Sequence, residues 1–599
     1  MLLLPVLAAL TCPDPVPIFH DGAREGQICT DIAAQTGYTV LDLGPDWTPA
    51  ALAPGPDGVA PAYRATYLAI AQGRLDDAGD EGVRAKADGG LEVFGFVPTF
   101  ERVAARLADD GRHRCHDAID DAALTGLATD IREQPKAVAA ARVTFARNLR
   151  AGLERERVRK HLPDVDALAA LDRGHARRVA RLHAAEQYVG AIRAAQAHLV
   201  CEGLLAPRQV DGRYTWQTAL AVLAFQRSNE LVPRGHLDAD TRALLADDSR
   251  MVDYRTALRA LRERVVSATG LIEDGSAGAG NTPVMGQRLA AAAWSQVLGH
   301  APLPDAAPDL VDAATDAAAR ALGWTDPATT LAALRVAPPR AAVVLPPPPP
   351  YHASHMDLAV EIDRGDVWYD LHPRAHHASY RPSLTLYAFD HMRRIPLVRW
   401  PTTIGGWKKE LHGRWHEVDR WMESPVGPRV WRELYVAPAW LAPDTTPDRD
   451  LVHSIGHSNT LATDLLGPSY RSAYGLLMLV HEKEVFTRRG TRFLDERVRT
   501  HGSGSITSIF DGHSHGCHRL APLYALRLGG FLLAHRDHVR RGEQRTWFTR
   551  RVHYHGDFTA HVTSRGYLVE LTPPVPVNVL PGRIRSARKT PPQYHDALP

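Results

Sequence analysis

The stretch "HGSGSITSIFDGHSHGCHRL", residues 501–520, decides how the C-terminal part of the chain is interpreted. It carries four histidines and one cysteine, Cys517, among glycine-containing turns, and it has few residues that could build a core. The next residues, 521–539, are apolar at helical spacing with Pro522 in the first turn, and they predict a long helix. We therefore expect Cys517 on a loop that leads into a helix N-terminus, where unpaired N–H groups and the helix dipole favour a thiolate.

A cysteine nucleophile and a metal site are the two chemistries that fit this stretch. A nucleophile needs a base from another strand, and "VRTHGS" offers His501 at a strand end before a glycine turn. The backbone amides of His515, Gly516 and Cys517 could then hold an oxyanion. The residues that could nominally bind zinc are His501, His513, His515, Cys517 and His518. We disfavour zinc because adjacent side chains of a loop point to opposite sides, and because no CxxC pair or helical HxxxH is present.

Length and charge restrict the class of protein. A chain of 599 residues is expected to form three or four domains rather than one core. Lys and Arg number 70 against 68 Asp and Glu, which leaves a formal charge of +2, and neither sign forms a long run. Nucleic acid is therefore not an expected partner.

The cysteines and the N-terminus bear on the compartment. Five scattered cysteines are too few for a disulfide scaffold, and a bridge between Cys29 and Cys115 is the only one that we expect. The opening "MLLLPVLAAL" fits the apolar part of a signal segment, which predicts export, with an N-terminal strand or a mis-set start as the alternatives. No later stretch reaches about 18 uninterrupted apolar residues, so no transmembrane segment is expected.

Composition divides the chain into segments of a multi-domain α+β protein. Helices rich in Ala, Arg and Leu are expected first, and five consecutive prolines, 346–350, then form a stiff spacer that we do not expect inside a packed domain. Beyond it, short runs such as "SLTLYAF" and "RIPLVRW" predict a mostly β domain. The expected segments are 1–11 (candidate signal segment), 12–130 (role unknown), 131–186 (helical), 187–250 (three-helix bundle), 251–335 (helical), 336–355 (proline-rich linker), 356–582 (mostly β domain) and 583–599 (tail).

Residues 189–246 contain a repeated spacing. Gly212 precedes Thr218 by six positions and Gly235 precedes Thr241 by six, and we expect each threonine to open a helix. The spacing alone predicts a three-helix bundle, and the pattern closely resembles peptidoglycan-binding modules. The expected core residues are Leu220, Leu223, Phe225 and Leu244, with Cys201 as a buried structural thiol.

The opening stretch resembles a second family. The order His501-Gly502-Ser503 and then Ser514-His515-Gly516-Cys517-x-Arg519-Leu520 resembles the signature of L,D-transpeptidase catalytic domains of the YkuD type. Upstream, "LTLYAFDHMRRIPLVRWPTTIGG", "SPVG" and "GPSYRSAYGLLML" resemble further parts of that domain, so that the resemblance covers 356–579. His518 departs from the usual aliphatic residue, and the segment 482–499 is longer than in compact members, which leaves the lid over the site unpredicted. We expect His513 and His518 to be exposed loop residues.

The resemblance implies roles for the matching residues. They are Cys517 as nucleophile, His501 as general base, Gly502 or Ser503 as the group that orients the imidazole, Ser514, His515 and Gly516 as residues beside the reacting atoms, and Arg519 as a substrate or scaffold contact. Such enzymes attack the bond between meso-diaminopimelate and D-Ala of a peptidoglycan tetrapeptide stem, without a cofactor. An amine acceptor gives a 3→3 cross-link. Water gives the L,D-carboxypeptidase outcome, and an inactive wall-binding structural protein is the third alternative.

Together the two resemblances imply an exported enzyme of the periplasm or cell wall, with peptidoglycan as substrate and as docking ligand. Membrane association is left open.

Overall fold

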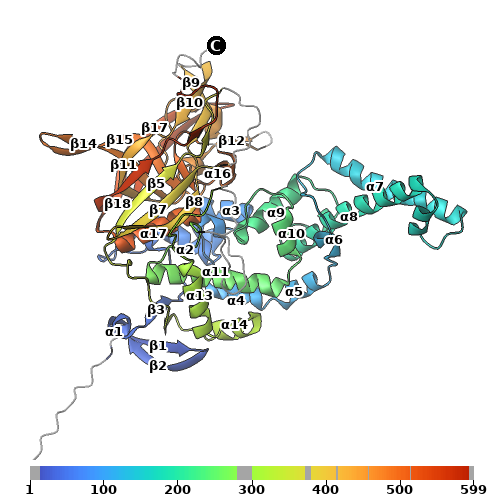
Figure 1. Ribbon diagram of the computed structural model, residues 1–599, viewed down its shortest axis with the longest axis horizontal. Helices are drawn as coiled ribbons and strands as arrows, with labels where there is room; N and C mark the ends of the chain where they lie inside the picture. Colours follow the sequence, from blue (N-terminus) through green and yellow to red (C-terminus); the bar gives the residue numbers. More distant parts are fainter. Residues whose placement is uncertain are drawn as a thin grey trace, which may run out of the picture. The chain divides into compact units, whose positions relative to one another are not determined.

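The computed structural model describes residues 12, 14–278, 300–370, 380–412, 416–455, 458–512 and 514–592 (Figure 1). The candidate signal segment 1–11 lies outside the described residues. The chain forms two compact units. The first unit consists of Met1–Val83, Phe94–Ala104 and Ala257–Pro599, and the second unit consists of Arg84–Val93 and Ala105–Thr256.

The second unit is helical, as its Ala- and Leu-rich sequence predicts. Its main helices are α5 (Asp110–Asp117), α6 (Ala122–Thr125), α7 (Lys136–Arg159), α8 (Arg173–Cys201), α9 (Trp216–Ser228), α10 (Ala239–Leu245) and the start of α11 (Ser249–Thr269). Helix α8 begins where the carboxylate of Asp172 accepts the N–H groups of Gly174 and His175, at 2.7 and 2.9 Å. This is the capping arrangement that satisfies free N–H groups at a helix start.

The first half of the sequence repeat is built around a buried glutamine of α8. The side-chain oxygen of Gln196 accepts the N–H of Gly212 at 2.9 Å, and its amide nitrogen donates to Oγ1 of Thr218 at 3.0 Å. Gly212 has φ of +77°, a left-handed conformation that favours glycine. One buried side chain thus joins a glycine turn to the first turn of the next helix.

The second half repeats this arrangement on α9. The oxygen of Gln226 accepts the N–H of Gly235 at 2.8 Å, and its nitrogen donates to Oγ1 of Thr241 at 2.8 Å. The threonines do not open their helices as expected. They lie in the first turn instead, because Thr215 precedes α9 and Asp238 caps α10.

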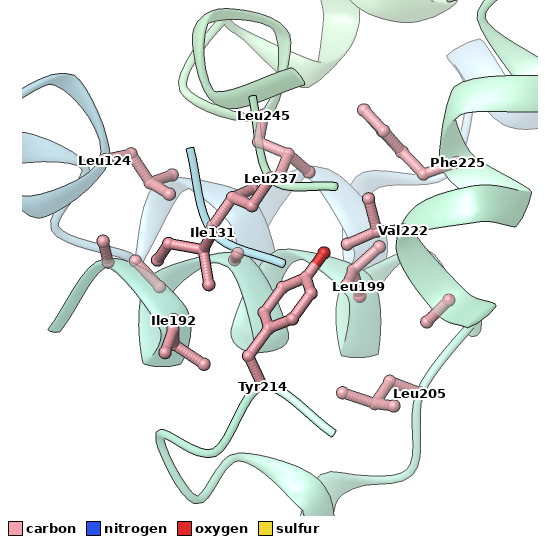
Figure 2. Close-up of a cluster of buried hydrophobic side chains, with 14 residues drawn as sticks. Leu124, Ile131, Ile192, Leu199, Leu205, Tyr214, Val222, Phe225, Leu237 and Leu245 are labelled. Atoms are coloured by element: carbon pink, nitrogen blue, oxygen red, sulfur yellow. The ribbon is translucent and has the colours of Figure 1, made fainter. Parts of the chain in front are cut away.

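The core of this bundle is shown in Figure 2, and it does not include Leu220, which we expected there. Phe225 is buried with Val222, whereas Leu220 is 54% exposed. The buried residues of α9 follow a stripe at three- and four-residue spacing, and position 220 lies off that stripe. Leu223 and Leu244 are half-buried, and Leu244 packs against the core. The buried members of the core include Leu124, Ile131, Ile192, Leu199, Leu205, Tyr214, Val222, Phe225, Leu237 and Leu245.

Two disulfides replace the one that we expected. Cys115 of α5 pairs with Cys201 at the end of α8, and Cys12 pairs with Cys29, so the predicted Cys29–Cys115 bridge is wrong. Cys201 is therefore not a free buried thiol either. The reason is tertiary, because α5 packs against α8 within the second unit while Cys29 belongs to the first.

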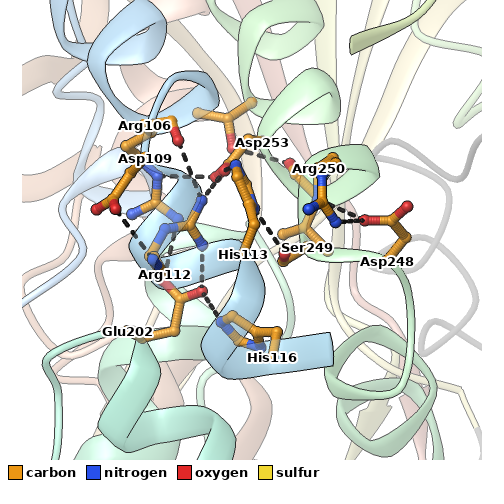
Figure 3. Close-up of polar contacts among 12 residues, drawn as sticks. Arg106, Asp109, Arg112, His113, His116, Glu202, Asp248, Ser249, Arg250 and Asp253 are labelled. Atoms are coloured by element: carbon orange, nitrogen blue, oxygen red, sulfur yellow. Dashed lines mark hydrogen bonds and ion pairs between the residues drawn. The ribbon is translucent and has the colours of Figure 1, made fainter. Parts of the chain in front are cut away.

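A buried charged network lies between α5, the residue after α8 and the start of α11 (Figure 3). Arg112 donates to Glu202 at 2.7 Å, and Arg106 donates to Glu202 at 3.0 Å and to Asp253 at 2.9 Å. The Glu202 side chain is 6% exposed and the Asp253 side chain is fully buried. Burial acts to raise the pKa of Glu202, but His116 and the two arginines hold it well below its usual range. The network ties α5 and the end of α8 to the start of α11.

The first unit contains the predicted β-rich region. The described strands form a sheet in the order β16-β15-β14-β11-β18-β5-β7-β8, with β17 paired to β18. The strands are β5 (Asp357–Asp363), β7 (Ser383–Asp390), β8 (Arg393–Pro401), β11 (Gly427–Val436), β14 (Leu477–Thr487), β15 (Gly490–Gly502), β16 (His518–Leu520), β17 (His538–His553) and β18 (Asp557–Val579). The runs expected to be strands, such as 383–389 and 394–400, are strands here. The length of the segment 482–499 left the lid over the site unpredicted. In the structure this segment belongs to a long hairpin of β14 and β15 that projects from the sheet in Figure 1.

The predicted helix after the cysteine motif is α17 (Pro522–His535). It is shorter than the expected 521–539 because the chain turns extended at Arg536 and enters β17. The helix lies close against the sheet. A Cβ on Gly529 would come within 2.2 Å of Leu477, and one on Gly502 would come within 3.3 Å of Pro522. Glycine at these positions allows the close approach.

The expected proline-rich linker, 336–355, contains a buried strand. Residues Arg340–Val343 form β4, which lies between β1 (Pro15–His20) and β3 (Thr39–Asp42) in a sheet of order β2-β1-β4-β3, where β2 is Ala23–Cys29. Ala341, Ala342 and Val343 are fully buried. The prolines flank this strand, and the run 346–350 follows it as a mostly exposed segment.

We predict that Gln226→Leu destabilises α9 and α10 by about 1–3 kcal/mol, because it leaves the N–H of Gly235 without its acceptor and removes the amide that donates to the hydroxyl oxygen of Thr241. Hydrogen exchange of peptides from 216–245 measures this change. Gln217→Leu on the same helix, where the side chain is half-exposed, is the control and should cost less than about 1 kcal/mol. Equal losses in the two variants would contradict the role given to Gln226.

Candidate active site

Two neighbouring strands bring the histidine and cysteine of the motif together. β15 and β16 pair in parallel, with Thr500 opposite His518, His501 opposite Arg519 and Gly502 opposite Leu520. Cys517 is the residue immediately before β16. The end of one strand therefore carries His501 and the start of its neighbour carries Cys517.

The imidazole of His501 has a defined tautomer. Its Nδ1 lies 2.5 Å from the carbonyl oxygen of Gly502, which can only accept, so Nδ1 carries the proton and Nε2 is the basic nitrogen. The ring is 2% exposed, and the ring of Tyr474 packs edge-on at 5.0 Å. Burial, together with the charge of Arg519, lowers the pKa of His501 to about 3. The imidazole is thus neutral and able to accept a proton over the whole physiological range.

Cys517 carries the free thiol. All five cysteines lie in the described residues, and the other four form disulfides. The side chain is half-buried, and burial raises the pKa of the thiol, while the charge and backbone N–H of Arg499 act against that rise. The expected stabilisation of a thiolate by a helix N-terminus is wrong, because β16 separates Cys517 from α17.

Two hydroxyl side chains, from short connections between other strands, hold the cysteine segment. Oγ1 of Thr403 donates to the Cys517 carbonyl at 2.8 Å and accepts the N–H of Arg519 at 3.0 Å. Oγ of Ser424 donates to the Gly516 carbonyl at 2.8 Å. The sequence pattern predicted no role for these two hydroxyls. No local pattern indicates that they reach a segment about 100 positions away.

The loop before Cys517 has a strained glycine and two available amides. Gly516 has φ of +95°, and a Cβ there would lie 2.9 Å from the Glu423 carbonyl, so only glycine fits. Its N–H donates to Oγ of the buried Ser514 at 3.3 Å. Within the described part of the chain, the N–H groups of His515 and Cys517 have no acceptor, which leaves them available to a developing oxyanion.

The remaining motif residues have different surroundings. His515 is half-exposed, with Nε2 3.3 Å from the Glu410 carboxylate. Ser503 does not orient His501, because its hydroxyl donates to the carbonyl of Ser505. Gly502 performs that role through its carbonyl, as described above.

Two cations, Arg519 and Lys408, lie near the cysteine segment. Arg519 donates to Oγ of Ser508 at 2.8 Å, and burial lowers its pKa. Burial, with the charge of Arg519, lowers the pKa of Lys408 to about 8. Lys408 and Glu410 share one face of β9 (Gly405–His412), because side chains of a strand alternate. This group of two cations and one carboxylate suits a substrate with a free carboxylate and an amine.

The expectation that His518 is an exposed loop residue is wrong, because its side chain is fully buried. Its Nδ1 lies 3.0 Å from the Thr403 carbonyl, and its ring packs 4.9 Å from that of His481. His513 lies outside the described residues. Among the residues that are described, no group of three or more His, Cys, Asp or Glu side chains could hold a metal ion.

Comparison with known proteins identifies one part of the chain. Residues 189–245 match the family model of the peptidoglycan binding domain, which covers the bundle of α9, α10 and the end of α8. This confirms the sequence-based assignment of that bundle and associates the chain with the cell wall. No curated protein matches the chain. None of the described helices is long and apolar enough to span a bilayer.

We predict that alkylation of Cys517 by iodoacetamide accelerates continuously as the pH rises past 9, because burial raises the pKa of the thiol and the neutral His501 forms no ion pair with it. Intact mass of the unreduced protein follows the reaction, since Cys517 is its one free thiol. His501→Ala should leave the shape of this profile unchanged. A plateau of the rate below pH 7 would show a preformed thiolate–imidazolium pair and would contradict the described site.

We also predict that the folded state loses stability as the pH falls from 6.5 toward 4. Burial lowers the pKa of His518 to about 4 and that of His501 to about 3, and it holds the pKa of His481 well below its usual range. The unfolded chain binds protons at these positions near pH 6.5 and the folded chain does not, so each histidine costs about 1.4 kcal/mol per pH unit.

Urea unfolding at pH 7.0 and 5.5, followed by tryptophan fluorescence, measures this loss. His518→Val should lose about 1.4 kcal/mol less than the parent between these pH values. His391→Gln is the control, since that side chain is 96% exposed, and it should behave as the parent does. An identical loss in His518→Val and the parent would refute the burial argument.

Proposed function

We propose that this chain is a cysteine acyltransferase of peptidoglycan, an L,D-transpeptidase that cross-links stem peptides. The observation that carries the proposal is the pairing of β15 with β16, which sets a neutral His501, oriented by the Gly502 carbonyl, beside the segment of the free thiol of Cys517. The peptidoglycan binding domain at 189–245 supports the choice of polymer. The resemblance of the motif to YkuD-type domains supports the choice of reaction.

In the first half of the reaction, Cys517 forms a thioester with the donor stem. Nε2 of His501 takes the thiol proton as sulfur attacks the carbonyl between diaminopimelate and D-Ala. The N–H groups of His515 and Cys517 receive the negative charge of the tetrahedral intermediate. Collapse breaks the C–N bond, the imidazolium returns its proton to the departing amine, and D-Ala leaves.

In the second half, an amine of a neighbouring stem attacks the thioester. His501 accepts a proton from this amine, the C–S bond breaks, and the thiol of Cys517 is regenerated with its proton. The product is a new amide between two stems. Water in place of the amine gives a trimmed tripeptide, which is the carboxypeptidase alternative.

The positive groups beside the site fit the terminal residue of the donor. Lys408 and Arg519 favour the free carboxylate of a terminal D-Ala, and a carboxylate within a few ångströms of a cation gains a charge-assisted bond. The buried Glu410, which lies 3.3 Å from Nε2 of His515, adds a negative charge that favours an amine. This complementarity supports an enzyme that acts at the end of a peptide rather than in its middle.

The disulfides support an exported protein. Bridges such as Cys115–Cys201 form and persist in oxidising compartments and are rare in the reducing cytosol. We therefore propose the periplasm or cell wall as the site of action.

We predict that the full chain releases D-Ala from purified disaccharide tetrapeptide. A dimer lighter than two substrates by one D-Ala identifies the transpeptidase, whereas monomeric tripeptide alone identifies the carboxypeptidase. We expect the dimer, because the polymer-binding domain brings neighbouring stems within reach. Mass spectrometry of the products distinguishes the two.

Cys517→Ala should release no D-Ala, since alanine has no group to attack the carbonyl, and excess chelator should change nothing. Intact tetrapeptide after prolonged incubation with folded, reduced protein would refute the catalytic proposal and leave a wall-binding structural protein. Inactivation by chelator with recovery on added zinc would show a metal enzyme instead.

A further inference from the structure

The outer face of β17 presents a tryptophan to solvent. Exposed and covered residues alternate along this strand, and Arg545, Trp547, Thr549 and Arg551 all lie on the exposed side. Trp547 is 83% exposed, although a side chain of its size normally gains by burial. An exposed aromatic residue in the middle of a regular strand therefore needs an explanation.

The opposite face of the same ribbon is firmly anchored. Phe548 and Val552 pack into an apolar cluster with Leu451 and Val562. Arg550, between them, donates to the carboxylate of Asp448 at 3.1 Å. Trp547 is therefore held on a rigid two-stranded platform and not on a mobile loop.

An irregularity in the strand pairing lies at Trp547. Arg545 pairs with Ser564 and Phe548 pairs with Val562, so three steps along β17 match two steps along β18. The extra residue makes a β-bulge, a feature that redirects side chains and is common beside binding sites. The bulge includes Trp547.

Two cations flank the tryptophan. Within the described residues, the side chains of Arg545 and Arg551 have no ion-pair or hydrogen-bond partner, whereas Arg541 on the same strand pairs with Glu570 at 2.8 Å. Six residues of strand separate the two unpaired arginines by about 20 Å. Along β17, the exposed indole of Trp547 therefore lies between the two positively charged side chains.

We propose that this face of β17 and β18, defined by Arg545, Trp547 and Arg551, binds the glycan strand of peptidoglycan. The apolar side of a sugar ring packs on the indole of Trp547, and the carboxylates of stem peptides approach the two arginines. A linear row of groups suits a linear polymer. The inference rests on the proposed function for the identity of the polymer, which the peptidoglycan binding domain supports independently. A nucleic acid fits less well, because the chain has a formal charge of only +2 and the face has two unpaired cations.

The test uses the full chain and co-sedimentation with purified peptidoglycan sacculi. Trp547→Ala should weaken apparent affinity at least fivefold, because losing one of two linked attachments lowers avidity. Arg545→Ser with Arg551→Ser should weaken it at least threefold and reduce its dependence on salt. Phe486→Ala is the control, since Phe486 is 79% exposed on the β14–β15 hairpin, and it should bind within twofold of the parent.

Release of D-Ala from soluble disaccharide tetrapeptide separates this inference from the proposed function. Trp547→Ala should still release D-Ala from this soluble substrate, because Cys517 and His501 are unchanged. If the parent releases none, the proposed function fails, while the binding comparison still decides the glycan inference. Parent-like sacculus binding by Trp547→Ala, an equal loss in Phe486→Ala, or weakened binding to single-stranded DNA without weakened sacculus binding would each overturn the glycan site.

Discussion

Three parallel residue pairs between β15 and β16 set the geometry on which the rest of the candidate site depends. They align the end of one strand with the start of another that lies 16 positions further along the chain. Thr403 and Ser424 then fix the cysteine segment through its carbonyls. Because these hydroxyls belong to the β8–β11 region, the position of Cys517 depends on the fold of the whole sheet and not on the motif alone.

Burial gives this site a resting state without an ion pair. It raises the pKa of Cys517 and lowers that of His501, so both groups are neutral at pH 7. In the proposed reaction, the thiol proton moves to His501 only when the substrate carbonyl is bound, so that backbone N–H groups can share the charge of the oxyanion. Arg499 and Arg519 lie close enough to favour the thiolate at that moment. On this proposal, desolvation keeps the thiol protonated until the substrate is bound.

Local sequence patterns were sufficient to predict many of the helices and strands and the peptidoglycan-binding bundle. They were insufficient where packing between distant segments determined burial or disulfide pairing. Hydrophobic alternation predicted the strands, and helical spacing with Pro522 predicted α17. Spacing could not show that Leu220 lies off the buried stripe of α9, nor that Cys29 pairs with Cys12. His518 looked like a loop residue because its strand has only three residues and is stabilised by β15. The roles of Cys517 and its neighbours came from a family resemblance and remain proposals.

The central claim is that Cys517 becomes acylated, and trapping the acyl-enzyme tests it most directly. The full chain is mixed with disaccharide tetrapeptide, quenched in acid within seconds, digested without reduction and analysed by mass spectrometry. The peptide containing Cys517 should gain the mass of the substrate minus D-Ala, and hydroxylamine should remove this adduct, as expected of a thioester. An adduct on another residue, or D-Ala release by Cys517→Ala, would contradict it.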